Sequence, residues 1–170
     1  CDMCFMTKCP YVPPHEFNLD FPHLMLRYRA LQKKQNKLTL IPAQLAKIDR
    51  NAKIGVMFSW FVNWVSDVKN KFLRKILELA VGIDKRAKLP TYNSETFTNY
   101  FKRNNNSINI KEIDKSRKVV IYSTCFVNFN KKVTGVAALK VLKKNGVEVK
   151  EAYPGCCGMP FLQQADLLKV

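Results

Sequence analysis

The chain has 170 residues, of which 47% are hydrophobic, so it can form one domain or one and a half around a buried core, which excludes a disordered tail. With 29 Lys and Arg against 13 Asp and Glu, the formal net charge is +16, which favours a nucleic acid, an anionic membrane surface or an acidic protein as partner. The basic residues are spread over both halves, a distribution typical of a solvated surface.

The chain begins with a loop punctuated by cysteine and proline. Two residues separate Cys1 from Cys4, and Cys9 is followed directly by Pro10. This spacing is close to the Cys-x2-Cys-x2-Cys-x3-Cys-Pro run of bacterial ferredoxins, whose soft thiolates hold iron–sulfur clusters. By matching position, Cys1 and Cys4 would share one cluster and Cys9 would serve a second. A zinc knuckle and a Cys-x2-Cys redox pair are the alternatives.

A helix is predicted from His15 to about Lys34. Pro13 and Pro14 suit its entrance, and basic residues gather near its C-terminal end, where they favour the helix dipole. His15 and His23 are expected on roughly one face of this helix. They could ligate a metal or relay protons near a quinone, or they could cap and pack against a neighbouring loop.

Two further helices are predicted, one from near Pro42 into residues 56–65 and one from about Asp67 to Val81, ending at Gly82. The longest uncharged apolar run, residues 54–66, has 13 residues, fewer than the roughly 20 that span a bilayer. Its aromatic side chains fit ordinary core, an interface with a partner protein, or, aided by nearby lysines, a membrane surface. These aromatic residues are Phe58, Trp60, Phe61 and Trp64.

A short helix beginning at Ser94 and a linker at residues 103–107 lead to a second region with a different pattern. Residues 118–124 (KVVIYST) read as a buried strand, residues 134–145 as a helix stopped by Gly146, and residues 147–152 as a second strand. A turn at residues 155–159 then leads to a helix opened by Pro160. The predicted fold is therefore α/β, with a mostly helical N-terminal half followed by a small parallel βαβα unit.

Three cysteines follow the two predicted strands. Cys125 comes directly after the first strand, and the adjacent Cys156 and Cys157 come shortly after the second. Because the carboxyl ends of parallel strands meet at one edge of a sheet, we expect these three thiols to form one site. Gly155 and Gly158, on either side of the pair, permit the sharp turn that exposes both adjacent thiols. A buried thiol pair or a strained vicinal disulfide is the alternative.

Both ends of the chain resemble one family of iron–sulfur oxidoreductases. Cys125 and the run Cys156-Cys157-Gly158-x-Pro160 resemble the cysteine-rich CCG domain of heterodisulfide reductase B-type subunits and of the iron–sulfur subunit of anaerobic glycerol-3-phosphate dehydrogenase. The start, residues 1–30 (CDMCFMTKCPYVPPHEFNLDFPHLMLRYRA), looks like their distal ferredoxin motif, and residues 63–97 resemble their linker region. The resemblance implies a longer parent protein, in which residues 1–14 end a ferredoxin-type 4Fe–4S domain, residues 15–107 form a helical connector and residues 108–170 begin a CCG domain.

The resemblance also implies a function. Electrons would pass from a flavoprotein or other redox subunit through 4Fe–4S clusters to a cluster held by Cys125, Cys156 and Cys157, which would also be the catalytic residues, and on to a quinone or disulfide acceptor. Both cluster sites would be incomplete in this chain, because ligands such as the family's downstream Cys-x2-Cys lie outside it. The protein would be cytoplasmic or peripheral on the inner face of the membrane, with no specific nucleic acid as partner. The alternative is a basic, zinc-stapled nucleic-acid-binding or adaptor module.

Overall fold

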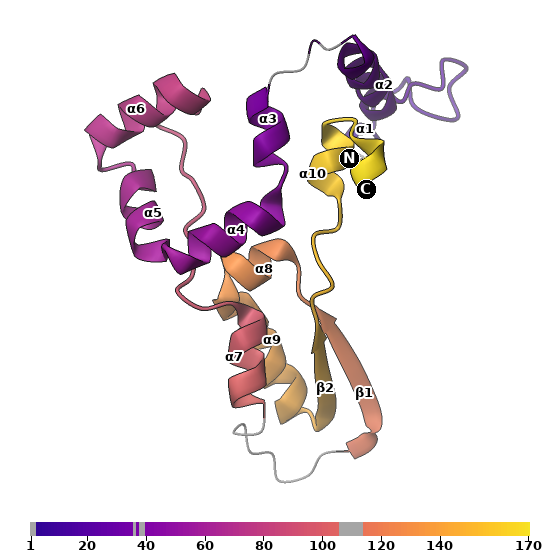
Figure 1. Cartoon of the computed structure of the whole chain (residues 1–170). Coiled ribbons are helices and arrows are strands. Elements are labelled where there is room, and N and C mark those ends of the chain that lie inside the picture. The colour runs from indigo at the N-terminus through magenta and orange to yellow at the C-terminus, as the bar shows by residue number, and fades with distance from the viewer. Residues whose placement is uncertain (1–2, 36, 38–39, 106–113) are drawn as a thin grey trace. The chain divides into compact units, whose positions relative to one another are not determined.

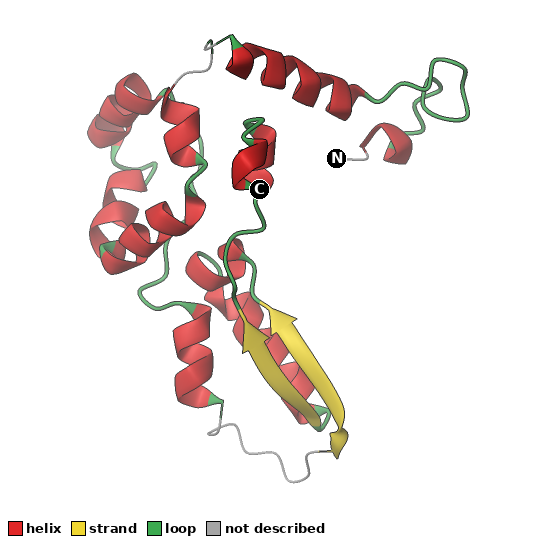
Figure 2. Cartoon of the chain, turned by 45° about the vertical axis from the view of Figure 1, so that its right-hand side comes forward, coloured by secondary structure: helices red, strands yellow, loops and turns green. Residues whose placement is uncertain are grey.

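The computed structural model of the chain describes residues 3–35, 37, 40–105 and 114–170 (Figure 1). These residues are mostly helical, with one two-stranded parallel sheet, which confirms the predicted α/β class (Figure 2). The elements are α1 (Met3–Met6), α2 (Phe21–Lys34), α3 (Leu40–Leu45), α4 (Ile48–Met57), α5 (Ser59–Ser66), α6 (Lys71–Val81), α7 (Phe97–Asn104), β1 (Asp114–Tyr122), α8 (Cys125–Phe129), α9 (Lys132–Lys144), β2 (Val147–Ala152), α10 (Met159–Gln163) and the 3-10 helix η1 (Leu167–Lys169).

The chain divides into two compact units. Unit 1 joins the N-terminal stretch Cys1–Lys47 to the C-terminal stretch Gly158–Val170, and unit 2 is the continuous stretch Ile48–Cys157. Within unit 1, α2 is tied to the C-terminal segment by the ion pair of Lys33 with Asp166, at 2.7 Å, and by the bond that Arg29 donates to the Gln163 carbonyl.

The core of unit 2 forms where α7 and α9 pack against β2. Phe97 and Leu139 are fully buried there, and Val149 contributes from the centre of β2. α9 places Gly135 against the Phe97 ring, so closely that an added Cβ would lie 2.7 Å from it. Glycine therefore lets this helix approach α7, and both helices hold the sheet that carries the cysteine loops.

β1 and β2 pair in parallel, with Lys118 opposite Glu148 and Tyr122 opposite Ala152. β2 lies where the sequence predicts it, whereas β1 begins at Asp114 and ends at Tyr122 rather than covering residues 118–124. β1 is also less buried than its apolar pattern suggests. Val120 is 60% exposed. Among the described residues, β2 makes most of the sheet's contacts with the packed helices, and β1 reaches the core through Ile121.

Several helix boundaries differ from prediction. α2 begins at Phe21 rather than His15, because Asp20 caps it by accepting the His23 backbone N–H at 3.1 Å. The segment predicted as one helix from Pro42 to residue 65 is divided among α3, α4 and α5. α7 starts after the Thr96 cap rather than at Ser94, and α10 stops at Gln163. α8, which starts at Cys125, was not predicted. The predicted linker at residues 103–107 lies partly within α7 and partly outside the described residues.

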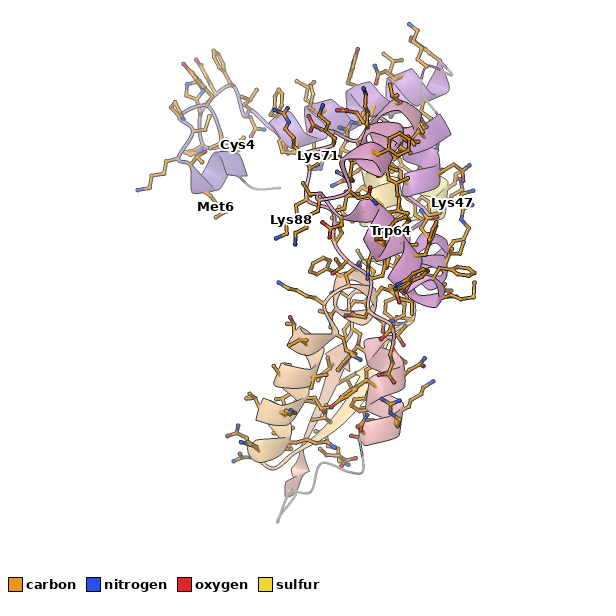
Figure 3. The ribbon with its side chains drawn as sticks, turned by 90° about the vertical axis from the view of Figure 1, so that its left-hand side faces the viewer. Cys4, Met6, Lys47, Trp64, Lys71 and Lys88 are labelled. Carbon is orange, nitrogen blue, oxygen red and sulfur yellow. The ribbon has the colours of Figure 1, made fainter. Side chains whose placement is uncertain are left out.

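The aromatic stretch of α5 is not core. Trp60 is 82% exposed, and Phe61 and Trp64 are about half exposed. On the next helix, Phe72 is 74% and Leu79 81% exposed. Figure 3 shows Trp64 among the side chains of this region. None of the helices within the described ranges has the length and apolarity that a bilayer-spanning segment requires.

Candidate functional site

The site is built at the carboxyl ends of the two parallel strands. The Ser123 backbone N–H donates to the Ala152 carbonyl at 3.0 Å, which carries the pairing one residue past β1. Thr124 then caps α8 by accepting the Val127 N–H, so Cys125 becomes the first residue of a helix. The chain direction thus changes between the strand and the thiol, which places Cys125 at the carboxyl edge of the sheet.

A buried polar network fixes this edge. Ser123 is fully buried, and its hydroxyl donates to Glu151 Oε1 at 2.6 Å. The Thr98 hydroxyl lies 2.9 Å from the same oxygen, and Asn128 Oδ1 accepts the Thr98 backbone N–H. Because buried polar groups are costly when unpaired, these bonds lock α7, α8 and both strands into one arrangement beneath the cysteines.

The second cysteine loop is held by an aspartate from a distant part of the chain. Asp49, in the first turn of α4, accepts the Cys156 backbone N–H at 3.0 Å and, with its other oxygen, the Tyr153 hydroxyl. On the other side of the loop, the Tyr122 hydroxyl donates to the Gly155 carbonyl at 3.2 Å. Gly155 has a φ of 146°, a backbone conformation that favours glycine. Three side chains therefore fix the backbone that presents Cys156.

Cys125 lies near enough to Cys156 for the two thiols to interact. Burial raises the pKa of the Cys125 thiol, and the direct interaction with Cys156 and the proximity of Cys157 raise it further. Burial and the bond to Asp49 likewise raise the pKa of Tyr153 far above its usual range, so its hydroxyl stays a donor. All three cysteines are free thiols, half-buried at Cys125 and Cys156 and exposed at Cys157, so no vicinal disulfide is present.

The N-terminal cysteines belong to unit 1. Cys4 lies in α1, and its carbonyl accepts the Cys9 backbone N–H at 2.9 Å, so the loop folds back on itself. Both are free and half-buried, whereas Cys1 lies outside the described residues. Over the part of the chain that the structure describes, no three Cys, His, Asp or Glu side chains are arranged to hold a single metal ion.

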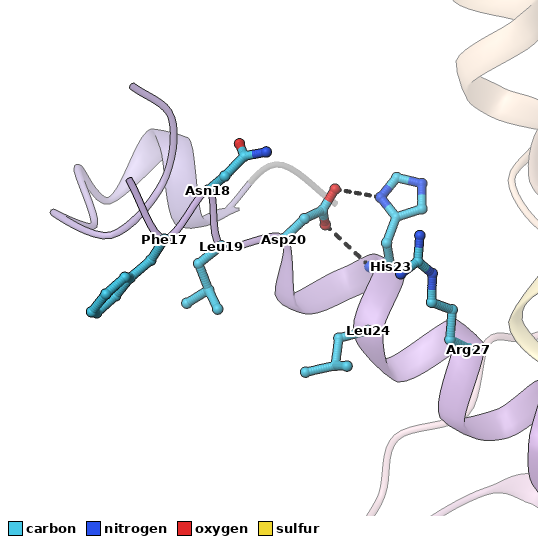
Figure 4. Close-up of a pocket in the computed structure, with 7 residues that line it drawn as sticks. All are labelled: Phe17, Asn18, Leu19, Asp20, His23, Leu24 and Arg27. Carbon is cyan, nitrogen blue, oxygen red and sulfur yellow. Dashed lines mark hydrogen bonds and ion pairs between the residues drawn. The ribbon is translucent and has the colours of Figure 1, made fainter. Parts of the chain in front are cut away.

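The two histidines do not share a helix face, because His15 precedes α2. His15 Nδ1 accepts the Phe17 backbone N–H, and its ring packs against Tyr11 and Phe17. His23 pairs through Nδ1 with the Asp20 carboxylate. Figure 4 shows this pair beside a surface hollow of about 550 Å³ lined by residues 17–20, 23, 24 and 27. Both histidines thus serve in capping and packing.

Sequence reasoning missed Asp49 and Tyr153. Tyr153 directly follows the second predicted strand and precedes the cysteine pair, so its position in the sequence could have indicated a place at the site. Asp49 carries none, since an acidic residue in the first turn of a helix is common and its partners lie 104 and 107 residues away.

Comparison with known proteins supports the resemblance to this group of iron–sulfur proteins. Residues 119–166 match the CCG family, described as a cysteine-rich domain. The chain is 29% identical over 119 residues to the C subunit of anaerobic glycerol-3-phosphate dehydrogenase from Escherichia coli K12, and equally to that from Escherichia coli O157:H7. The match covers 69% of this chain and 28% of each relative, so the chain spans less than a third of their length. No solved structure matches. Residues 119–166 of this chain are thus similar to the CCG cysteine-rich domain, and the chain is similar to part of that dehydrogenase component.

Proposed function

We propose that this chain is part of an iron–sulfur electron-transfer subunit of an oxidoreductase. The observation that carries the proposal is that Cys125 follows β1 and the pair Cys156–Cys157 follows β2, so the three thiols come from the carboxyl ends of two parallel, paired strands. Three free thiols from two loops offer the soft ligand type that iron–sulfur clusters require. The CCG match over residues 119–166 supports the same conclusion.

The residues present fit such a group in their chemistry. A cluster is wider than a single ion, so its thiolate ligands need not form the tight set that one ion demands. When bound, the cluster would supply one-electron chemistry. The chain's own part would be to present the thiolates: Asp49 and Tyr122 hold the loop of Cys156, and the network of Ser123 and Glu151 holds the turn before Cys125. Such support around ligands tunes a site as much as the ligands do.

The finer proposal concerns the partners and the domain layout. We propose that Cys1, Cys4 and Cys9 belong to a ferredoxin-type 4Fe–4S domain ending at residue 14, that residues 15–107 form a connector, and that residues 108–170 begin the CCG domain. Electrons would come from a flavoprotein or other redox subunit and leave to a quinone or disulfide acceptor at the site of Cys125, Cys156 and Cys157. The name of the similar dehydrogenase component, which is one subunit among others, supports a redox partner.

A second proposal is peripheral contact with an anionic membrane surface, at the cytoplasmic face. It is supported by the exposed aromatic face of α5, in particular Trp60 and Trp64, with Lys69 and Lys71 following directly in the sequence. Aromatic rings and lysines are the side chains that settle at the boundary between lipid headgroups and acyl chains.

The iron–sulfur proposal is tested on the full-length protein that contains this chain, purified and reconstituted without oxygen. Iron, acid-labile sulfide and visible absorbance are measured, and reduced clusters are followed by electron paramagnetic resonance. Cys156→Ser should remove the signal of the CCG site and the reduction of the acceptor, while the ferredoxin-type signals persist, because the two cysteine groups hold separate clusters.

Cys9→Ser is the matched control, since it should remove a ferredoxin-type signal and leave the CCG signal. Loss of the same signal in both variants would contradict two separate sites. Stoichiometric zinc without iron in the wild-type protein would refute the electron-transfer proposal and favour the zinc-stapled module.

A further inference from the structure

A basic pocket of about 440 Å³ lies in unit 2 and shares no residue with the cysteine site. It is lined by Val68, Lys71, Arg74, Lys75, Lys85 and Arg86, so that five of its six lining residues are cationic. Figure 3 marks Lys71, the first residue of α6. The pocket forms between the start of this helix and the loop that follows its end.

Arg74 forms the buried part of this pocket. It is 0% exposed, and its guanidinium donates to three backbone carbonyls, those of Asp84, Lys85 and Ala87, at 2.6–3.2 Å. These bonds use Nε and Nη2. Nη1 is buried and has no hydrogen-bond partner among the described residues.

A buried guanidinium held only by carbonyls is an unusual arrangement. Carbonyl dipoles satisfy individual N–H groups but bring no negative charge, and an unpaired charge away from water is costly. An anion that accepts a hydrogen bond from Nη1 would supply both the missing partner and the missing negative charge. Arginine favours oxyanions, because its planar N–H groups match phosphate and carboxylate oxygens.

The nearby acidic side chains are already occupied. Both oxygens of Asp84 are bound by Arg86, which lowers the pKa of that carboxyl to about 2. Glu78 accepts the Lys85 backbone N–H, at 3.4 Å. Within the described ranges no ion pair engages the ammonium groups of Lys71, Lys75 or Lys85, so the pocket keeps a positive excess. The N-terminus of α6, whose first turn has no acidic residue, adds to it.

From these observations we propose that the pocket binds a phosphate group, with Arg74 as its buried anchor and Lys71, Lys75 and Lys85 around it. Several unpaired cations suit a group of two negative charges better than a single carboxylate. The phosphate can come from a soluble ligand or from a lipid headgroup, and both share this chemistry. The inference concerns α6 and its loop alone and does not depend on the iron–sulfur proposal.

The test uses the full chain and titrates inorganic phosphate by isothermal titration calorimetry at constant, low ionic strength. Arg74 itself is left unchanged, because it also anchors the loop and its loss would disturb folding. In its place, Lys71→Gln combined with Lys75→Gln should weaken phosphate binding about tenfold. Lys140→Gln combined with Lys144→Gln, two exposed lysines of α9, is the control with the same change of charge and should weaken it less than about twofold.

A second arm measures flotation with vesicles of phosphatidic acid in phosphatidylcholine. If the pocket pair reduces vesicle binding and free phosphate does not bind at millimolar concentration, the phosphate belongs to a lipid. If the pocket pair weakens phosphate binding but not vesicle binding, the ligand is soluble. If the pocket pair weakens phosphate binding and vesicle binding alike, the pocket accepts phosphate from either source. Equal effects of the pocket pair and the α9 pair in both arms, or no binding in either arm, would refute the site.

Discussion

Among the described residues of unit 2, two buried basic side chains are held by backbone carbonyls rather than by carboxylates. Arg74 is one, and Lys143 near the end of α9 is the other, at 6% exposure. The ammonium of Lys143 donates to the Asn105 carbonyl, which joins α9 to the end of α7. Lysine can relieve the cost of burial by losing its proton, whereas arginine cannot.

Lys143 gives a prediction on pH. Burial lowers the pKa of Lys143 below its usual 10.5, so the folded state binds this proton less tightly than the unfolded state. The unfolded state then binds more protons, and the stability contributed by this group rises as the pH approaches 10.5. Between about pH 7 and about pH 10, the free energy of unfolding of the wild type should rise relative to that of Lys143→Met, measured by urea denaturation.

Lys144→Met, at the neighbouring exposed position, is the control and should show no such trend. The prediction would be contradicted if the free energy of unfolding of the wild type, relative to that of Lys143→Met, stayed constant or fell as the pH rises.

At the scale of elements, small residues decide how closely the helices approach. Gly82 ends α6 with a φ of 75°, as its position after an amphipathic run predicts. Gly55 and Gly135 have another role that their helical context hides: each lies under an aromatic ring, of Tyr92 and of Phe97 respectively, where a Cβ would stand 2.7 Å from the ring.

The substitution Gly135→Ala should therefore lower the free energy of unfolding, the opposite of what Gly→Ala usually does in an exposed helix. In an exposed helix, Gly→Ala stabilises by up to about 1 kcal/mol, since glycine has the greater backbone entropy when unfolded. Here the methyl group would meet Phe97 and Val127 in a packed core, and we expect a loss of about 1–3 kcal/mol. Thermal or urea unfolding measures it, and Thr134→Ala, one residue earlier and exposed, should change stability by less than about 0.5 kcal/mol. A stabilised Gly135→Ala variant would show that α7 and α9 are not so closely packed.

For the whole molecule, the net charge of +16 and the exposed aromatic face act on different partners. Charge alone draws the chain to any polyanion, with an affinity that falls steeply with salt. An aromatic side chain gains free energy only where it can leave water, as at a lipid interface. The two contributions can therefore be separated by comparing vesicles with DNA.

Trp60→Ser should reduce binding to anionic vesicles about tenfold and leave binding to duplex DNA unchanged, because it removes apolar area and no charge. Tyr28→Ser, an exposed aromatic of α2, is the control and should have little effect. Vesicle flotation measures binding to the anionic vesicles, and fluorescence anisotropy with two unrelated duplexes measures binding to DNA. A sequence-selective DNA complex that survives physiological salt would contradict the expected absence of a specific nucleic-acid partner.

The sequence by itself determined the local parts of this protein. Apolar alternation set β2 at residues 147–152, a glycine stop set the end of α6, and the spacing of six cysteines indicated thiol ligand sets. These signals are readable because helix period, strand alternation and caps depend on neighbours a few residues apart. The order of strands and helices then predicted a parallel pair with cysteines at its carboxyl edge, and the parallel pair is confirmed.

Only the tertiary structure decided which distant residues support that edge. Asp49 reaches Tyr153 and Cys156 across more than a hundred residues, and Arg74 finds the carbonyls of a loop beyond its own helix. Likewise, only the packing of unit 2 left the α5 aromatics exposed. The physical reason is that such hydrogen bonds and exposures depend on how completed elements pack. From the sequence alone, an aspartate, arginine or tryptophan gives no sign of whether the folded chain brings a distant partner into contact with it.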